Sequence, residues 1–175
     1  MPQPPGEPFL EGVRFLRAAL QTLPSHPLPK RILIRPAGPA PCAEDIARYL
    51  ARSYAEAGKS VVYVPLSGQV GSQTADPLGF DRVQVMPPDG TVNLAARGGP
   101  RAFLAAAGSR AEFVVVAAGG SGAGQDVAAF AIEADAAVLA VDPAVSSIRA
   151  VAGEAGALRR NGARIAGIAL CERRR

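Results

Sequence analysis

The chain has 175 residues, 49% of them hydrophobic and 19% charged, so it can bury one sizeable core and is too apolar to be disordered throughout. Its net charge of +4 is compatible with a polyanionic partner, but the arginines are scattered apart from the last three residues and no nucleic-acid-binding motif accompanies them, so we expect no nucleic acid partner. No stretch reaches the roughly 18 apolar residues of a membrane span and no signal peptide is recognisable, which predicts a cytoplasmic protein.

The beginning of the chain predicts an extended arm followed by a single domain. Residues 1–8 are rich in proline, which fixes φ and lacks the backbone N–H that a helix needs. Residues 9–175 contain no linker, repeat or change of composition that would separate a second domain.

A first helix is predicted over residues 11–23. Its apolar residues recur at helical spacing, and Glu11, Arg14 and Arg17 fall on another face of the helix. The prolines that follow end this helix before the next element begins.

From residue 31 onward, short apolar runs alternate with helical patterns. The apolar runs are continuous, as strands buried on both faces of a sheet require, and the helices between them supply the crossovers of a parallel sheet. The sequence therefore predicts an α/β fold, a doubly wound, mostly parallel sheet with flanking helices. We expect strands over residues 31–35, 60–66, 112–118, 137–142 and 164–170, helices over 46–58, 101–108, 125–134 and 146–162, and weaker strand candidates at 82–86 and 91–95.

The loop after the first strand is the position of a phosphate-binding loop, because ligands of such sheets bind beyond the carboxyl ends of the strands. A functional loop reads GxxxxGK[ST]: glycines let the backbone approach phosphate, lysine neutralises its charge and the hydroxyl holds magnesium. The segment from Arg35 to Asp45 reads RPAGPAPCAED and has neither a lysine nor a hydroxyl. The sequence therefore predicts a phosphate-loop fold without these binding residues.

Several segments carry a resemblance to one known family. The first helix contains E-x-x-R-x-x-R at Glu11, Arg14 and Arg17, residues 49–65 read YLARSYAEAGKSVVYVP, and later segments read ADAAVLAVD and GARIAGIALC. In this order they are similar to the oligomerisation motif, the helix-strand pair after the phosphate loop and the last strands of the bacterial tyrosine kinase family. These are the cytoplasmic P-loop domains attached to or paired with polysaccharide co-polymerases. The resemblance covers nearly the whole chain and implies a P-loop NTPase-like fold.

Carried over residue by residue, the resemblance implies that three separated nucleotide-binding motifs are lost together. Phosphoryl transfer depends on positioning and on charge stabilisation by lysine and metal, so we expect no catalysis, no cofactor and no metal. The C-terminal tyrosine cluster of the family is replaced by ERRR. The motif positions are occupied by Cys42, Ala43 and Glu44 in the phosphate loop, by Pro65 and Ser67 in the second Walker motif, and by Ala117 in place of the Walker B aspartate.

The resemblance thus implies a pseudokinase that is an assembly or regulatory partner in exopolysaccharide biosynthesis or export. The expected partners are further copies of the chain, a polysaccharide co-polymerase membrane protein or an active kinase paralogue, and such a partner would bring the domain to the inner membrane. Glu11, Arg14 and Arg17 are the candidate oligomer interface. The alternative for these three residues is a helix face that simply contacts water.

A rival function uses the loop over residues 119–124, which reads GGSGAG, follows a strand and opens a helix. Asp142 ends the next strand about 20 residues later, as in a dinucleotide-binding unit. The glycine spacing is not GxGxxG, so a simple turn is the alternative.

A second rival is an enzyme that uses Cys42 as a nucleophile, because a helix N-terminus stabilises a thiolate. The adjacent Glu44 and Asp45 oppose that stabilisation. Two cysteines are too few for a disulfide framework, and no His or Cys cluster surrounds either one to suggest zinc, so we expect Cys42 and Cys171 to be reduced thiols.

Overall fold

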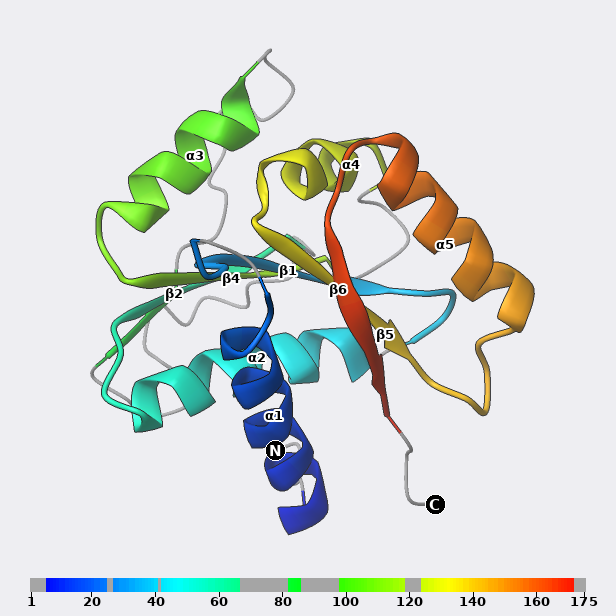
Figure 1. Ribbon diagram of the computed structural model, residues 1–175, viewed down its shortest axis with the longest axis horizontal. Coiled ribbons are helices and arrows are strands. Elements are labelled where there is room, and N and C mark those ends of the chain that lie inside the picture. Colours follow the sequence, from blue (N-terminus) through cyan, green and yellow to red (C-terminus); the bar gives the residue numbers. More distant parts are fainter. Residues whose placement is uncertain are drawn as a thin grey trace.

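The computed structural model describes residues 6–24, 27–40, 42–66, 82–85, 98–118 and 124–171. Six parallel strands form one sheet in the order β3-β2-β4-β1-β5-β6 (Figure 1). This arrangement confirms the doubly wound α/β fold. In chain order the elements are α1 (Glu7–Gln21), β1 (Arg31–Pro36), α2 (Cys42–Glu56), β2 (Val61–Pro65), β3 (Val83–Val85), α3 (Gly99–Gly108), β4 (Phe113–Ala117), α4 (Gly124–Glu133), β5 (Ala136–Val141), α5 (Ile148–Arg160) and β6 (Ile165–Leu170).

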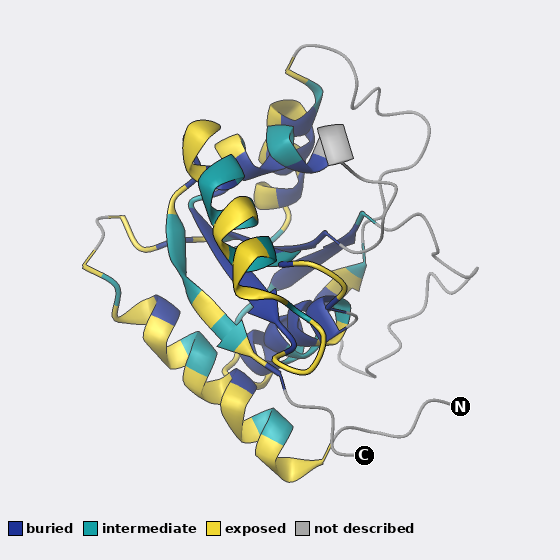
Figure 2. Cartoon of the chain, turned by 90° about the vertical axis from the view of Figure 1, so that its right-hand side faces the viewer, coloured by how far each residue is buried: buried dark blue, intermediate teal, exposed yellow. Residues whose placement is uncertain are grey.

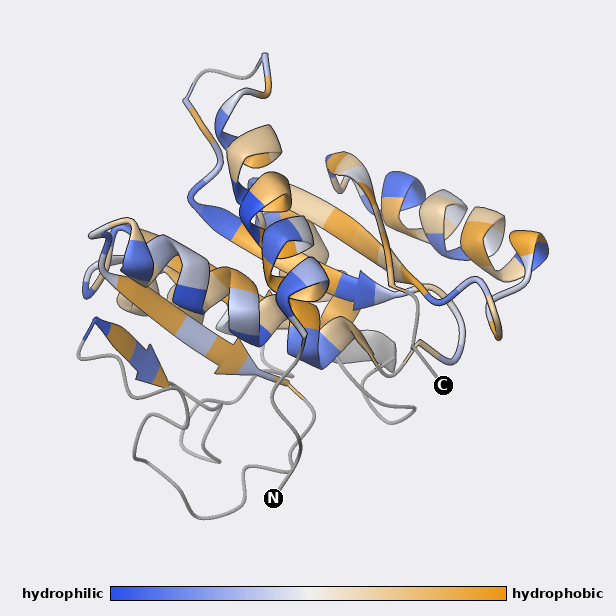
Figure 3. Ribbon diagram, turned by 90° about the horizontal axis from the view of Figure 1, so that it is seen from below, coloured by the Kyte–Doolittle hydropathy of each residue, from blue (hydrophilic) through white to orange (hydrophobic). Residues whose placement is uncertain are grey.

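The central strands are buried on both faces, which explains their continuous apolar sequences. Along β1, Ile32 and Ile34 face the core beneath α1 and α2, whereas Leu33 faces the core beneath α3, α4 and α5. Each of these three side chains is fully buried and contributes about 1.5–3 kcal/mol to folding. Figure 3 shows hydrophobic residues running along the strands, and polar residues on the outer sides of the helices.

The two edges of the sheet differ in length. Strand β3 has only three residues, whereas β6, at the opposite edge, has six. Strand β6 is paired with β5 on one side only, and all of its residues are intermediate or exposed (Figure 2). The β6 edge is therefore the longer stretch of backbone without a neighbouring strand among the described residues.

Two boundaries differ from the sequence-based expectation. Helix α1 begins at Glu7, inside the segment expected to be an extended arm, because Pro8 lies in the first turn, where proline loses no helical hydrogen bond. Helix α2 begins at Cys42 rather than after Asp45, so the acidic residues lie within its first turn.

Some expected elements lie outside the described residues, namely the beginning of the arm, the loop at 67–79 and the strand candidate at 91–95. The weaker strand candidate at 82–86 is confirmed as β3. In the described part of the chain, no helix has the length and apolar character needed to cross a membrane.

Candidate functional site

The candidate site is the carboxyl edge of the sheet, where the loops after β1, β2, β4 and β5 begin. Backbone hydrogen bonds of 2.9 Å join these loops to neighbouring strands: Ala37 N–H donates to Ala140 O in β5, Leu66 N–H to Ala117 O in β4, and Ala118 N–H to Ile34 O in β1. The loop positions expected to hold a phosphate group therefore meet at one edge, as the parallel topology requires.

The loop between β1 and α2 packs closely on the beginning of α5. Gly38 has φ of 81°, and a Cβ atom on it would lie 3.4 Å from Ala150 Cβ. A residue with a side chain would be strained there by both its backbone angle and its neighbour. Ala37 and Ala40 on either side are buried, so this loop is held against the protein interior.

The first turn of α2 carries acidic rather than basic side chains. Cys42 and Ala43 are buried, with 6% and 2% of their surface exposed, so neither presents a polar group to the edge of the sheet. Glu44 and Asp45 lie 3.4 and 3.9 Å from the guanidinium of Arg48, one turn further along the helix. Carboxylates at this position interact favourably with the helix N-terminus and repel a phosphate group.

Tyr63 of β2 lies beneath this turn. Burial is the main cause that raises the pKa of its hydroxyl, and the negative charge of Glu44 raises it further, against the opposing effect of Arg48. With 4% of its surface exposed, Tyr63 is a packed residue of the core, as is the fully buried Tyr54.

Both lysines of the sequence lie at the opposite edge of the sheet. Lys30 directly precedes β1, and Lys59 lies two residues before β2. The Lys59 ammonium lies 3.1 Å from the carboxylate of Glu112, the residue directly before β4. Since strands β1, β2 and β4 are parallel, these residues share the amino edge, and neither lysine takes the place of the phosphate-loop lysine.

The cation at the end of β1 is already paired. Arg35 donates from Nε to Glu154 Oε2 at 2.9 Å and from Nη2 to Glu154 Oε1 at 3.3 Å. This bidentate contact holds the end of β1 against α5 and neutralises the Arg35 guanidinium within the protein.

The other two motif positions are also apolar where the structure describes them. Pro65 and Ala117 are buried at the ends of β2 and β4, and Ser67 lies outside the described residues. Among the described residues, no group of three or more His, Cys, Asp or Glu side chains is placed to hold a metal ion.

Asp142, the acidic residue of the rival dinucleotide site, is 4% exposed. One oxygen of its carboxylate accepts a hydrogen bond from Ala144 N at 3.0 Å, which fixes the turn before α5. The burial leaves little carboxylate surface for a ribose hydroxyl. Most of the GGSGAG loop lies outside the described residues, and Gly124 opens α4.

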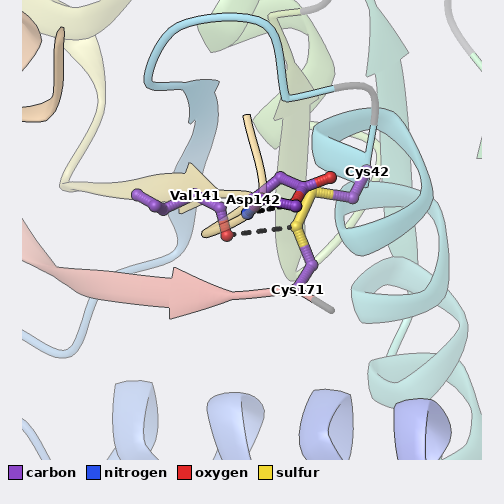
Figure 4. The surroundings of a disulfide bond; sticks show 5 residues. Cys42, Val141, Asp142 and Cys171 are labelled. Atoms are coloured by element: carbon purple, nitrogen blue, oxygen red, sulfur yellow. Dashed lines mark hydrogen bonds between the residues drawn. A yellow bond between two sulfur atoms is a disulfide. The ribbon is translucent and has the colours of Figure 1, made fainter. Parts of the chain in front are cut away.

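The expectation of two reduced cysteines is wrong in this structure, because Cys42 and Cys171 form a disulfide. Their Cα atoms are 6.5 Å apart across a sequence separation of 129 residues (Figure 4). The same bond removes Cys42 as a nucleophile in this state. Cys42 begins α2 and Cys171 follows β6, so both lie at the carboxyl edge of the parallel sheet. The strands and helices predicted from the sequence place both cysteines at this edge, and this was the indication of the pairing that the sequence offered.

The candidate interface residues of α1 take different positions. Arg17 donates through Nη1 to the carbonyl of Ser53 in α2, and Arg14 lies 3.0 Å from Glu7 and 3.9 Å from Glu56. Both arginines therefore help to attach α1 to α2 within the chain. Glu11 is exposed and forms no ion pair with a described residue.

A groove of about 1120 Å³ separates α1 from strand β6. Most of its lining is apolar and comes from α1, the beginning of α2 and β6, with Asp45 and Arg48 as charged members. Phe15 of α1 borders this groove with 77% of its surface exposed, and Cys42 and Cys171 both contribute to its wall. The groove is thus bounded at one place by the disulfide.

The fold and the carboxyl edge define a P-loop NTPase-like domain whose described phosphate-loop positions are apolar or acidic. Comparison with solved structures gives the same fold. The kinase domain of the Escherichia coli tyrosine kinase ETK is 17% identical with a TM-score of 0.74, covering 95% of this chain and 77% of that chain. The BceF tyrosine kinase domain is 16% identical, again with a TM-score of 0.74, covering 92% of this chain and 76% of that chain.

A more distant structure belongs to the same fold class. The nucleotide-binding protein of Archaeoglobus fulgidus in complex with ADP is 16% identical, with a TM-score of 0.57, covering 91% of this chain and 70% of that chain. No protein-family model and no curated protein sequence matches the chain. At these identities the comparisons show a shared fold, that of bacterial tyrosine kinase domains.

Proposed function

We propose that this chain is a non-catalytic P-loop-like domain, a pseudokinase that acts as an assembly or regulatory partner in exopolysaccharide biosynthesis or export. The observation that carries the proposal is the position of the lysines. Lys30 and Lys59 are the only two in the sequence, and both lie at the amino edge of the sheet, opposite the phosphate loop. In phosphoryl transfer, a lysine and a metal ion held by the loop hydroxyl stabilise the charge of the transferred phosphoryl group.

The charges around the phosphate loop support the same conclusion. Glu44 and Asp45 bring negative charge to the beginning of α2, and the guanidinium of Arg48 is shared between them. Arg35 is occupied by Glu154. A nucleotide phosphate at the beginning of α2 would meet these two carboxylates, while the guanidinium groups of Arg48 and Arg35 are both engaged in ion pairs.

The test is isothermal titration calorimetry of the full chain with ATP and Mg²⁺. We expect no binding heat for the wild type. A matched variant combines Ala43→Lys with Glu44→Thr and so restores a lysine and a hydroxyl at the two motif positions. We expect it to bind ATP more tightly than the wild type, because the backbone of the loop is retained. Submillimolar binding of Mg-ATP by the wild type would contradict the proposal.

The assembly role follows from the resemblance to bacterial tyrosine kinases and is supported by the apolar groove beside α1. The expected partners are further copies of the chain, a polysaccharide co-polymerase or an active kinase paralogue, in the cytoplasm or at the inner membrane through such a partner. Glycosyltransferase and chain-length-determinant genes beside the gene for this chain would support the process, and their absence would count against it.

A further inference from the structure

The cysteine pair joins two parts of the fold that have few other connections. Cys42 is the first residue of α2, on one face of the sheet, and Cys171 directly follows β6, the edge strand. The groove between α1 and β6 separates the edge strand from the helix layer on this face. The disulfide therefore spans from the edge of the sheet to the helix at the phosphate loop (Figure 4).

The rest of the fold does not depend on this bond. Two apolar cores, one on each face of the sheet, contain the central strands and the inner sides of the helices. A chain of 175 residues with these cores is large enough to fold without a covalent staple.

The surroundings of the pair also suit the reduced state. Cys171 N–H donates to Val141 O at 2.9 Å, and this hydrogen bond needs no disulfide. Cys171 Sγ lies 3.3 Å from the same carbonyl oxygen, so a thiol at this position has an acceptor already in place. Each cysteine is 6% exposed, so a reduced thiol packs there as a small side chain, and both residues border the groove beside α1. Both redox states therefore fit the same site.

We propose that Cys42 and Cys171 form a reversible redox latch that takes low-molecular-weight thiols and disulfides as its co-reactants. In the oxidising direction, one protein thiolate attacks a sulfur of oxidised glutathione, forming a mixed disulfide and releasing one glutathione thiolate. The second protein thiolate then attacks the protein sulfur of the mixed disulfide and releases the second glutathione. Overall, two protein thiols and one glutathione disulfide become one protein disulfide and two glutathione thiols.

The latch controls how firmly the end of β6 is held. In the oxidised protein, the strand is fixed to α2 by the disulfide and to β5 by the strand ladder. In the reduced protein, β6 keeps its ladder to β5 and the Cys171–Val141 hydrogen bond. The other side of β6, which faces the groove, is no longer attached to α2. Reduction thus loosens the edge strand and the beginning of α2 together, and leaves the central strands unchanged. This inference does not rest on the proposed function.

Two measurements on the full chain test the latch. The protein is equilibrated in buffers of increasing ratio of reduced to oxidised glutathione, and its free thiols are alkylated and counted by mass spectrometry. We expect half-oxidation at a ratio between those of reducing and oxidising cell compartments. A protein that remains oxidised in the most reducing buffer would identify a permanent structural bond, and one that never oxidises would exclude the disulfide. Either result overturns the proposal.

Hydrogen exchange of the oxidised and reduced wild type provides the second measurement. On reduction we expect amide exchange in residues 165–171 and in the first turn of α2 to accelerate by about tenfold or more, measured at exchange times too short for β1 and β4 to exchange through global unfolding. The variants Cys42→Ser and Cys171→Ser should match the reduced wild type in every buffer. Because the main comparison is between two states of the wild type, it holds even if a variant folds poorly. Equal exchange of β6 in the two states would overturn the latch.

Discussion

Arg35 and Glu154 form a two-pronged ion pair between the end of β1 and the middle of α5, with contacts of 2.9 and 3.3 Å. Arg35 is a cation at the carboxyl edge of the sheet, and its contact with Glu154 gives it a structural role. In a nucleotide-binding domain, a cation at this edge is available to the ligand. Here the protein uses it to hold a strand and a helix together.

The pair predicts a measurable contribution to stability. Glu154→Gln should lower the free energy of unfolding by about 1–2 kcal/mol, because the half-buried guanidinium loses its charged partner. Urea denaturation monitored by circular dichroism measures this change. As a control, Arg101→Ala removes a contact of 3.9 Å made by a side chain that is 78% exposed, and should change stability by less than about 0.5 kcal/mol. Equal effects of the two substitutions would contradict this assignment.

Asp135 predicts a loss of stability in acid. Burial raises the pKa of its carboxyl, but the hydrogen bonds from the Arg31 side chain and from the N–H groups of Arg31 and Lys30 outweigh burial, so the pKa lies below its usual 3.8. A lowered folded-state pKa gives stability that is present above pH 3.8 and is lost as the pH falls through the folded-state value. Unfolding midpoints between pH 7 and pH 2.5 should fall less steeply for Asp135→Asn than for the wild type. Parallel curves would show that Asp135 does not contribute.

Tyr54 predicts the opposite dependence, at alkaline pH. Burial raises the pKa of its hydroxyl from 10.0 to about 12, despite the opposing charge of Arg17. The contribution of Tyr54 to the free energy of unfolding is fully present below pH 10. Between pH 10 and 12 the free energy of unfolding falls by about 2–3 kcal/mol, because the phenol exposed on unfolding ionises more readily than the buried one.

The matched variant for this residue is Tyr54→Phe. The hydroxyl of Tyr54 has no hydrogen-bond partner within the described part of the chain, and its ring stacks on Phe113 at 4.2 Å. We expect near-wild-type stability at pH 7 and a smaller loss at pH 11, measured by urea unfolding. Some loss should remain, since burial also raises the pKa of Tyr63. An unchanged alkaline loss in the variant would contradict the role of Tyr54.

The motif on α1 predicts an effect on assembly. Arg14→Ala combined with Arg17→Ala should lower the molar mass measured by light scattering. Because both arginines also contact α2, this variant alone does not separate a direct interface from an altered position of α1. Glu11→Ala resolves the ambiguity, since Glu11 is exposed and has no ion pair among the described residues. A lower mass for both variants supports a direct interface, and a monomeric wild type excludes it.

The disulfide predicts a difference in global stability between the two redox states. A bond that closes a loop of 129 residues should stabilise the oxidised protein by about 2–4 kcal/mol, chiefly by restricting the unfolded chain. Urea unfolding with and without a phosphine reductant measures the difference. Cys171→Ser should show no response to the reductant. A wild type with the same midpoint under both conditions would contradict this prediction.

The succession of elements could be predicted from the sequence because it depends on local patterns. The continuous apolar run of β1 needs burial on both faces, and the helical spacing around Val13 and Leu20 of α1 needs burial on one. The missing lysine and hydroxyl at Ala43 and Glu44 are likewise visible in a single segment. Boundaries were less accurate, since Pro8 and Asp45 were placed outside helices that in fact include them.

The partners of individual side chains were decided by the tertiary structure. Arg35 and Glu154 are 119 residues apart, and no local pattern links them. Cys42 and Cys171 look like two isolated thiols until the parallel sheet brings the beginning of α2 and the end of β6 to one edge. The sequence by itself determined the fold class and the absence of lysine and hydroxyl side chains from residues 35–45. Which charges are neutralised, and which cysteines meet, depends on strand order and helix packing, because these bring distant segments within bonding distance.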